Sequence, residues 1–284
     1  MIDNLIEFWR RLDLLVNNYH YVHPDDVPFI DPRPHVALGN HHYVNLENCL
    51  VNNNTLIHTG LIPVPYAGDI RNAPICLIML NPGFHTEDYE WEYNNNAYRN
   101  ALINNLYQQN FGNYPFFYLD PQFDNSPGGR YWRWKFGNIA NHLADQFDGT
   151  TSEDIFQLIS RNVCVFEPFA YHSQNLGVNN GDLMAMPSFT HLVPAVGELV
   201  NDINRIPIVI RRVNNLWVPV ANENGWQELQ EIDDGIELEN IEEDTIYHLP
   251  TNQAQAFPVN PNYGIGRLIV QKKLQEINGN EQTI

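Results

Sequence analysis

The stretch Ile75-Cys76-Leu77-Ile78-Met79-Leu80-Asn81-Pro82-Gly83-Phe84 decides the fold of this 284-residue chain. Its first six residues are all apolar, which is typical of a short strand buried on both faces of a sheet. The Asn-Pro-Gly sequence then predicts a sharp turn of the backbone. In α/β folds, ligands bind at the carboxyl ends of the strands, so this turn would place the amide of Asn81 in a ligand crevice.

Three more short apolar runs predict further strands, at residues 163–166, 206–210 and 245–249. Helical periodicity predicts an N-terminal helix over 3–18 capped by Asp3, and four later helices at 138–147, 152–161 capped by Ser152, 188–204 and 267–277. Strands that alternate with helices indicate an α/β fold. We therefore expect a three-layer α/β/α sandwich with a four-stranded, mostly parallel sheet.

The chain is expected to form a single domain, 1–284, with an N-terminal extension (1–60), an aromatic insertion (89–136) and an acidic insertion (217–244). Residues 20–69 are rich in Pro, Asn, His and Gly, which predicts loops that wrap over the surface. The aromatic insertion holds 15 of the 34 aromatic residues, interleaved with arginines. It could wall a base pocket and stack bases, or form a small satellite core.

The formal net charge of −19 lowers the odds of nucleic-acid binding without excluding it, because the acids are unevenly distributed. Ten of them lie between residues 213 and 266, where Lys and Arg are absent. Twelve of the fifteen basic residues are arginines, whose forked guanidinium suits phosphate or carboxylate.

The sequence has no apolar run long enough for a membrane helix and no secretory signal, so a cytoplasmic protein without a membrane partner is expected. The three cysteines are scattered, which disfavours disulfides and a zinc site. We expect His41, His42 and His58 to be surface residues. Neither a metal nor a cofactor is predicted.

Two segments outside the first strand extend the pattern around Asn81. Phe166-Glu167-Pro168-Phe169, then Tyr171-His172-Ser173, follow the second strand, and Val259-Asn260-Pro261-Asn262-Tyr263-Gly264 precedes the last helix. With Pro65-Tyr66-Ala67-Gly68-Asp69-Ile70 before the first strand, this order resembles the uracil-DNA glycosylase superfamily, especially its mismatch and thymine glycosylase branches. The usual His-Pro-Ser form of the last motif is absent, and Asn260-Pro261-Asn262 is a loose substitute.

The resemblance implies catalytic and base-binding roles for the first two motifs. Asn81 would position the attacking water, since an amide can orient water without taking its proton. Backbone amides at Gly83 and Phe84 would contact the base or the water, and the ring of Phe84 would stack on a flipped base or serve as a core aromatic. The base-recognition position falls at Glu167 and Tyr171.

Glu167 departs from relatives that commonly place an amide there. A carboxylate could accept from the exocyclic amine of a cytosine, which favours a cytosine derivative over uracil; otherwise Glu167 would cap a loop at a strand end. His172 could protonate or bond the leaving base. DNA contacts are expected at Arg130, Arg133, Asn260, Pro261 and Asn262.

The function expected from these residues is monofunctional excision of an abnormal or modified base from DNA. Because some members of the superfamily act on modified bases in phage DNA, a bulky modified cytosine and a role in antiviral defence are candidates. Two alternatives stay open: hydrolysis of free nucleosides or nucleotides, and a catalytically silent module that binds a partner. Near these motifs the lone lysine is Lys135, which disfavours a Schiff-base lyase step.

Overall fold

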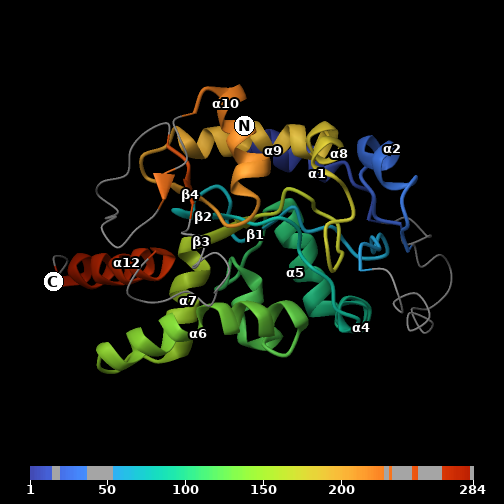
Figure 1. The fold of residues 1–284 in the computed structure, drawn as a ribbon. Helices are drawn as coiled ribbons and strands as arrows, with labels where there is room; N and C mark the ends of the chain where they lie inside the picture. Colours follow the sequence, from blue (N-terminus) through green and yellow to red (C-terminus); the bar gives the residue numbers. More distant parts are fainter. Residues whose placement is uncertain (15–19, 37–53, 227–229, 232–244, 249–263, 282–284) are drawn as a thin grey trace. The chain divides into compact units, whose positions relative to one another are not determined.

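The computed structural model describes residues 1–14, 20–36, 54–226, 230–231, 245–248 and 264–281 (Figure 1). Residue contacts divide the chain into two compact units, each assembled from separated segments. Unit 1 comprises Met1–Ala67, Ile78–Phe111 and Val165–Glu198, and unit 2 comprises Gly68–Leu77, Gly112–Cys164 and Leu199–Ile284. The expectation of one domain with insertions stays a prediction.

Unit 1 is built mainly from helices that bury one apolar face. Helix α1 (Ile2–Arg10) begins after Met1 rather than at Asp3 and ends well before the predicted residue 18. It packs against α5 (Asn96–Tyr107), which also contacts α4 (Glu87–Asn94) and strand β1 (Tyr66–Ala67). Further helices in the described part of unit 1 are η1 (Pro24–Asp26), α2 (Val27–Ile30), α8 (Asn180–Ala185) and α9 (Pro187–Val200).

Unit 2 is organised around the long helix α6 (Pro127–Gln146), which packs against α7 (Ser152–Asn162) and α12 (Gly264–Glu281). Ser126 caps α6, because its side chain accepts the backbone N–H of Gly129. A capping box formed by Thr151 and Asp154, rather than Ser152, starts α7. The unit also contains η3 (Phe117–Leu119), η4 (Pro121–Phe123), the π-helical turn η5 (Val213–Trp217) and α10 (Val218–Asn224).

The sheet confirms the α/β class but not its predicted form. The four expected strands are present as β2 (Ile75–Ile78), β3 (Val163–Phe166), β4 (Ile206–Val209) and β6 (Tyr247–His248). Two further strands, β1 and β5 (Gln230–Glu231), make six in the described residues, in the order β1-β3-β2-β4-β6-β5.

A four-stranded, mostly parallel sheet was therefore the wrong prediction. Strand β1 runs antiparallel to β3, with Tyr66 opposite Phe166, whereas β6 is parallel to both β4 and β5. The two additional strands have two residues each, and the alternation of side chains that reveals a strand needs a longer segment than that.

The described part of the segment 20–69, residues 20–36 and 54–69, is not the surface wrap that its composition predicts. In its described part, Tyr21, Ile57 and Ile62 are fully buried, and the polar side chains of His23 and Asp26 are buried as well. Hydrogen bonds make this burial tolerable: His23 Nε2 lies 2.9 Å from the carbonyl of Phe8, and Asp26 accepts from two partners.

The described helices include none with the length and apolar character needed to cross a membrane. The acidic insertion 217–244 begins within helical structure, because Trp217 ends η5 and α10 follows it directly. Residues 227–229 and 232–244 of this insertion lie outside the described residues.

Candidate functional site

Two chain segments of unit 1 run together where strands β2 and β3 end. The N–H of Met79 donates to the carbonyl of Phe166 at 2.9 Å, and the N–H of Phe169 donates to the carbonyl of Leu80 at 2.9 Å. The turn 80–84 and the segment 166–173 therefore lie side by side. The sequence predicted this meeting, because both segments follow strand ends.

The amide of Asn81 is held in one orientation by Ser173. Its Nδ2 lies 2.7 Å from the Ser173 carbonyl and 3.3 Å from the Ser173 hydroxyl oxygen. A carbonyl can only accept, so the nitrogen of the amide must face it and Oδ1 is the atom left to accept a hydrogen bond. Asn81 is half-buried, so this oxygen can orient a water molecule.

Glu167 lies beneath the same turn and is 7% exposed. Its Oε2 accepts the backbone N–H of Leu80 at 3.0 Å. Burial raises the pKa of this carboxyl group well above its usual range, although the Leu80 N–H opposes the shift. Burial therefore favours the neutral acid, whereas the sequence interpretation assumed a carboxylate. Such a group can donate a proton as well as accept a hydrogen bond.

His172 holds the glycine of the turn in place. Its Nδ1 lies 3.1 Å from the carbonyl oxygen of Gly83, and its Nε2 lies 3.1 Å from that of Ile62. Burial lowers the pKa of His172 to about 4, although both carbonyls oppose the shift. A neutral imidazole donates through one nitrogen, so it binds one of the two carbonyls at a time. His172 is placed to position the turn.

Gly83 is required by the shape of this turn. Its φ of +71° lies in the left-handed region that residues with a Cβ rarely adopt. Next to it, the ring of Phe84 is half-buried, with one face covered by the imidazole of His58. His58 is itself buried, so its assignment to the surface was wrong. Phe84 is thus a half-buried residue that packs against His58 and against the buried cluster of Leu61 and Tyr89.

Tyr171 faces away from the turn. Its hydroxyl donates to Asp26 Oδ2 at 2.8 Å and accepts the N–H of His23 at 3.2 Å, and its ring contacts Trp9 of α1 edge-on. His172, by contrast, contacts the carbonyls of Gly83 and Ile62. The predicted base contact at Tyr171 is therefore replaced by packing against α1.

Helix α4 supports the Ile62 segment with a buried acid that the sequence analysis did not single out. Both carboxylate oxygens of Glu92 accept the N–H of Ile62, at 3.2 and 3.1 Å, and Arg99 Nη1 lies 2.9 Å from Oε1. Burial raises the pKa of Glu92 to about 8 and Arg99 opposes the shift. Because Ile62 faces His172, this pair sets the position of the turn indirectly.

Among the expected DNA contacts in unit 2, Arg133 has an internal role. Its guanidinium bonds both carboxylate oxygens of Glu153, at 2.9 and 3.0 Å, and the carbonyl of Leu119. It thereby holds α6 against α7 instead of presenting charge to a phosphate. The exposed Arg130 bonds the carbonyl of Asn125. Asn260, Pro261 and Asn262 lie outside the described residues, as do His41 and His42.

Many aromatic side chains of the insertion 89–136 are buried, but they are divided between unit 1 and unit 2, so a single satellite core stays a prediction. Tyr89, Tyr98, Phe116, Trp132 and Phe136 are all buried. Two aromatic side chains of α6 remain exposed: Tyr131 at 38% and Trp134 at 57%. The ammonium of Lys135 lies 4.5 Å from the ring centre of Trp134 and 5.1 Å from that of Tyr131.

Comparisons of the chain with protein-family models, with curated proteins and with solved structures find no match.

Proposed function

We propose that this chain is a monofunctional DNA N-glycosylase that flips an abnormal or modified base out of DNA and hydrolyses its N-glycosidic bond. One arrangement supports the proposal above all. The turn of residues 80–84 is bonded to the segment 167–173 at Leu80, Asn81 and Gly83. These two segments carry the resemblance to the uracil-DNA glycosylase superfamily, and their contact brings the residues proposed for catalysis and base recognition to one place.

The reaction needs a positioned water and an acid for the leaving base. As the bond between the sugar and the base breaks, the base takes the electron pair and the sugar becomes oxocarbenium-like. Water held by Asn81 Oδ1 then bonds to the anomeric carbon and loses its proton to solvent. Because the sugar is already electron-poor, this weak nucleophile is sufficient, and a side chain that removes the proton is not required.

Glu167 is the proposed acid. Its Oε2 accepts from Leu80, so the proton of the neutral group resides on Oε1, where it can be donated to the departing base. A neutral carboxyl group also combines a donor with an acceptor. This pair complements N3 and the exocyclic amine of cytosine, which keeps a modified cytosine, such as one found in phage DNA, as the proposed target.

Phe84 is proposed to stack on the flipped base, with His58 supporting its other face. His172 is a positioning residue, since its ring nitrogens face the carbonyls of Gly83 and Ile62. The exposed pair Tyr131 and Trp134 is a proposed contact for single-stranded or unstacked DNA, whereas Lys135, whose ammonium contacts both rings, is itself buried.

An abasic-site assay tests the proposal. Duplex and single-stranded DNA carrying uracil, a thymine mismatch, hydroxymethylcytosine or glucosylated cytosine is incubated with the wild type, and with variants Asn81→Ala and Asn100→Ala. Asn100 lies on the exposed side of α5 and is the matched control. We expect one base to yield alkali-sensitive sites with the wild type and the control, but at least about 100-fold more slowly with Asn81→Ala.

Two other outcomes would overturn it. Cleavage of free nucleosides but not of DNA would make the protein a nucleoside hydrolase, which the net charge of −19 would tolerate better. A folded protein that cleaves none of these substrates would be a binding module. Strand cleavage without alkali would contradict the monofunctional mechanism.

A further inference from the structure

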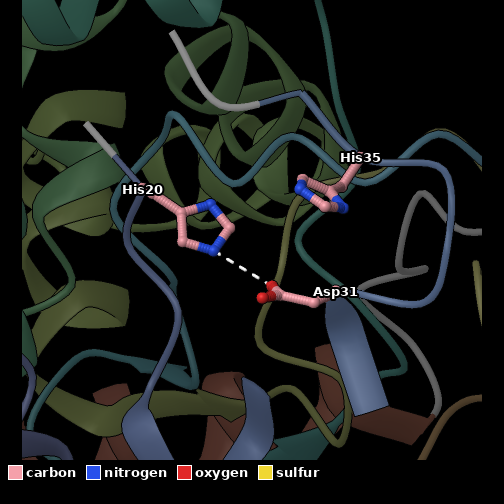
Figure 2. A group of neighbouring side chains, drawn as sticks. All are labelled: His20, Asp31 and His35. Atoms are coloured by element: carbon pink, nitrogen blue, oxygen red, sulfur yellow. Dashed lines mark hydrogen bonds and ion pairs between the residues drawn. The ribbon is translucent and has the colours of Figure 1, made fainter. Parts of the chain in front are cut away.

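Two histidines and an aspartate of unit 1 converge on one point in a region that the glycosylase proposal does not use. Figure 2 shows the side chains of His20, Asp31 and His35 directed toward one another. One potential ligand atom from each lies within 4.8 Å of the other two. The three residues are spaced eleven and four residues apart in the sequence, and histidine and carboxylate are ordinary ligands of zinc.

The hydrogen bonds of Thr59 fix the proton on His20. The Thr59 hydroxyl donates its single proton to the carbonyl of Val36 at 3.0 Å, and the same oxygen lies 3.0 Å from His20 Nδ1. It must therefore accept from Nδ1, which carries the hydrogen. In the neutral imidazole, Nε2 is then left with a lone pair.

A hydrogen bond fixes the tautomer of His35 in the same way. Its Nδ1 lies 2.9 Å from the carbonyl of Arg33, which can only accept, so Nδ1 carries the hydrogen and Nε2 has the lone pair. Metal-binding histidines characteristically donate their second ring N–H to such an acceptor, because this bond fixes the tautomer and orients the ring. Both histidines have this second partner.

The contact between His20 and Asp31 calls for a positive charge. Nε2 of His20 lies 3.1 Å from Oδ1 of Asp31 (Figure 2). A neutral imidazole with its hydrogen on Nδ1 would direct a lone pair at a carboxylate oxygen, which is repulsive. A proton on Nε2 removes the repulsion, and so does a metal cation between the two atoms; donor atoms on a tetrahedral zinc ion are about 3.3 Å apart, given bonds of about 2.0–2.1 Å.

We propose that His20, Asp31 and His35 bind a divalent transition-metal ion, with zinc as the natural candidate. Nε2 of each histidine and a carboxylate oxygen of Asp31 are the ligands. Three protein ligands leave a fourth position for water, and the 47% exposure of the Asp31 side chain keeps this position open to solvent. The ion would connect the chain at residue 20 to the segment that follows α2.

Zinc titration of the full-length protein at pH 7.5, in competition with a chromophoric chelator, tests the site. We expect one Zn²⁺ per chain, and a loss of affinity of at least about tenfold in each of His20→Ala, His35→Ala and Asp31→Asn. Thr59→Val removes the outer partner of His20 and should weaken binding by about 10–100-fold. His85→Ala, which changes an exposed histidine outside this group, is the matched control and should bind as the wild type does.

A second measurement avoids substitutions, so a variant that fails to fold leaves the proposal testable. The wild type is treated with diethyl pyrocarbonate with and without Zn²⁺, and each histidine is located by peptide mass spectrometry. Zinc should protect His20 and His35 but not His85. Equal modification with and without zinc would overturn the proposal, as would undiminished affinity in folded His20→Ala; the 3.1 Å contact would then be an imidazolium–carboxylate ion pair.

Discussion

The imidazole of His58 lies face to face against the ring of Phe84, with ring centres 3.4 Å apart and planes inclined by 7°. Burial lowers the pKa of His58 to about 3, so this support is an uncharged ring at neutral pH. The backbone N–H of His58 donates to the carbonyl of His172 at 2.8 Å. This bond joins His58 to the segment that holds the Asn81 turn. One face of Phe84 is therefore fixed, and the residue is half-buried.

This stacking predicts a substrate-binding role for Phe84. Replacing it with Ala should weaken binding of the target DNA by about 1–3 kcal/mol, the usual contribution of stacking one base on an aromatic side chain. Phe84→Tyr keeps the ring and is the matched control. The measurement is single-turnover excision over a range of enzyme concentrations. If Phe84→Ala and the wild type reach half of their maximal rate at the same enzyme concentration, the binding role is contradicted.

We expect that the amide nitrogen of Asn81 cannot be replaced by an oxygen without loss of activity. Asn81→Asp has nearly the same shape, but its carboxylate cannot donate to the Ser173 carbonyl that Nδ2 contacts at 2.7 Å. We expect Asn81→Asp to lose excision rate nearly as severely as Asn81→Ala, by about 100-fold or more. Initial rates on the preferred substrate test this. A rate for Asn81→Asp at or above that of the wild type would show that a general base is the better group, contrary to the mechanism proposed.

Glu167 should make excision fall at alkaline pH. Because burial raises its folded-state pKa, Glu167 keeps its proton to a higher pH than an exposed glutamate does and loses it as the pH rises through that raised value. The wild-type rate should decline over this range, whereas Glu167→Gln should be about 100-fold slower and lack the decline. A pH–rate profile of both proteins from pH 6 to 10 tests this.

The raised pKa of Glu167 also predicts that the stability of the wild type and that of Glu167→Gln depend differently on pH. Stabilisation by the neutral carboxyl group is complete below the ordinary pKa of glutamate and is lost as the pH rises through the folded-state value. The unfolding free energy of the wild type should therefore fall relative to Glu167→Gln as the pH increases from 5 to 9, as measured by urea denaturation. A constant difference would mean that Glu167 is ionised in the folded protein.

Three buried histidines should make the fold sensitive to acid. Burial lowers the pKa to about 4 in His23 and His172 and to about 3 in His58. The unfolded chain takes up protons near pH 6.5 while the folded chain does not, so stability is complete above that pH and is lost as the pH falls toward 4. Each histidine contributes about 1.4 kcal/mol per pH unit within this window.

Urea denaturation at pH 7.5 and pH 5.5 measures this loss. His58→Gln should show a smaller decrease in unfolding free energy between the two conditions than the wild type does. His85→Gln, which changes an exposed residue, should behave like the wild type. An equal decrease in His58→Gln and the wild type would show that His58 is protonated in the folded state.

Trp134 should contribute to DNA binding but not to folding. It is 57% exposed beside Lys135, so Trp134→Ala removes a stacking surface without opening a cavity. We expect single-stranded DNA affinity to fall by about 1–3 kcal/mol with the thermal midpoint unchanged. Ile203→Ala changes a residue that is 52% exposed and is the matched control. Fluorescence anisotropy with labelled DNA measures the affinity of both variants. Equal affinities of Trp134→Ala and the wild type would show that α6 is not part of the binding surface.

The sequence by itself determined the features that depend on local pattern. The apolar runs at β2, β3 and β4 predicted strands within a residue or two of their observed ends, because a buried strand is apolar throughout its length. The meeting of Asn81 with the segment 167–173 followed from the placement of both beyond strand ends. Helices α4 and α5 escaped prediction because polar residues such as Glu92, Asn105 and Gln108 are buried in or beside them, which obscures the apolar face.

The tertiary structure alone decided the chemical state of the site. Burial by distant segments favours the neutral form of Glu167 and keeps His58 uncharged, and desolvation leaves no trace in sequence pattern. Arg133 turns inward because Glu153 is positioned to bind it. The convergence of His20, Asp31 and His35, with Thr59 orienting the first, likewise depends on contacts between residues far apart in the chain. Hydrogen bonds and burial that arise where remote segments meet fix the protonation and the orientation of these side chains. Sequence periodicity indicates only which faces of a helix or strand are apolar.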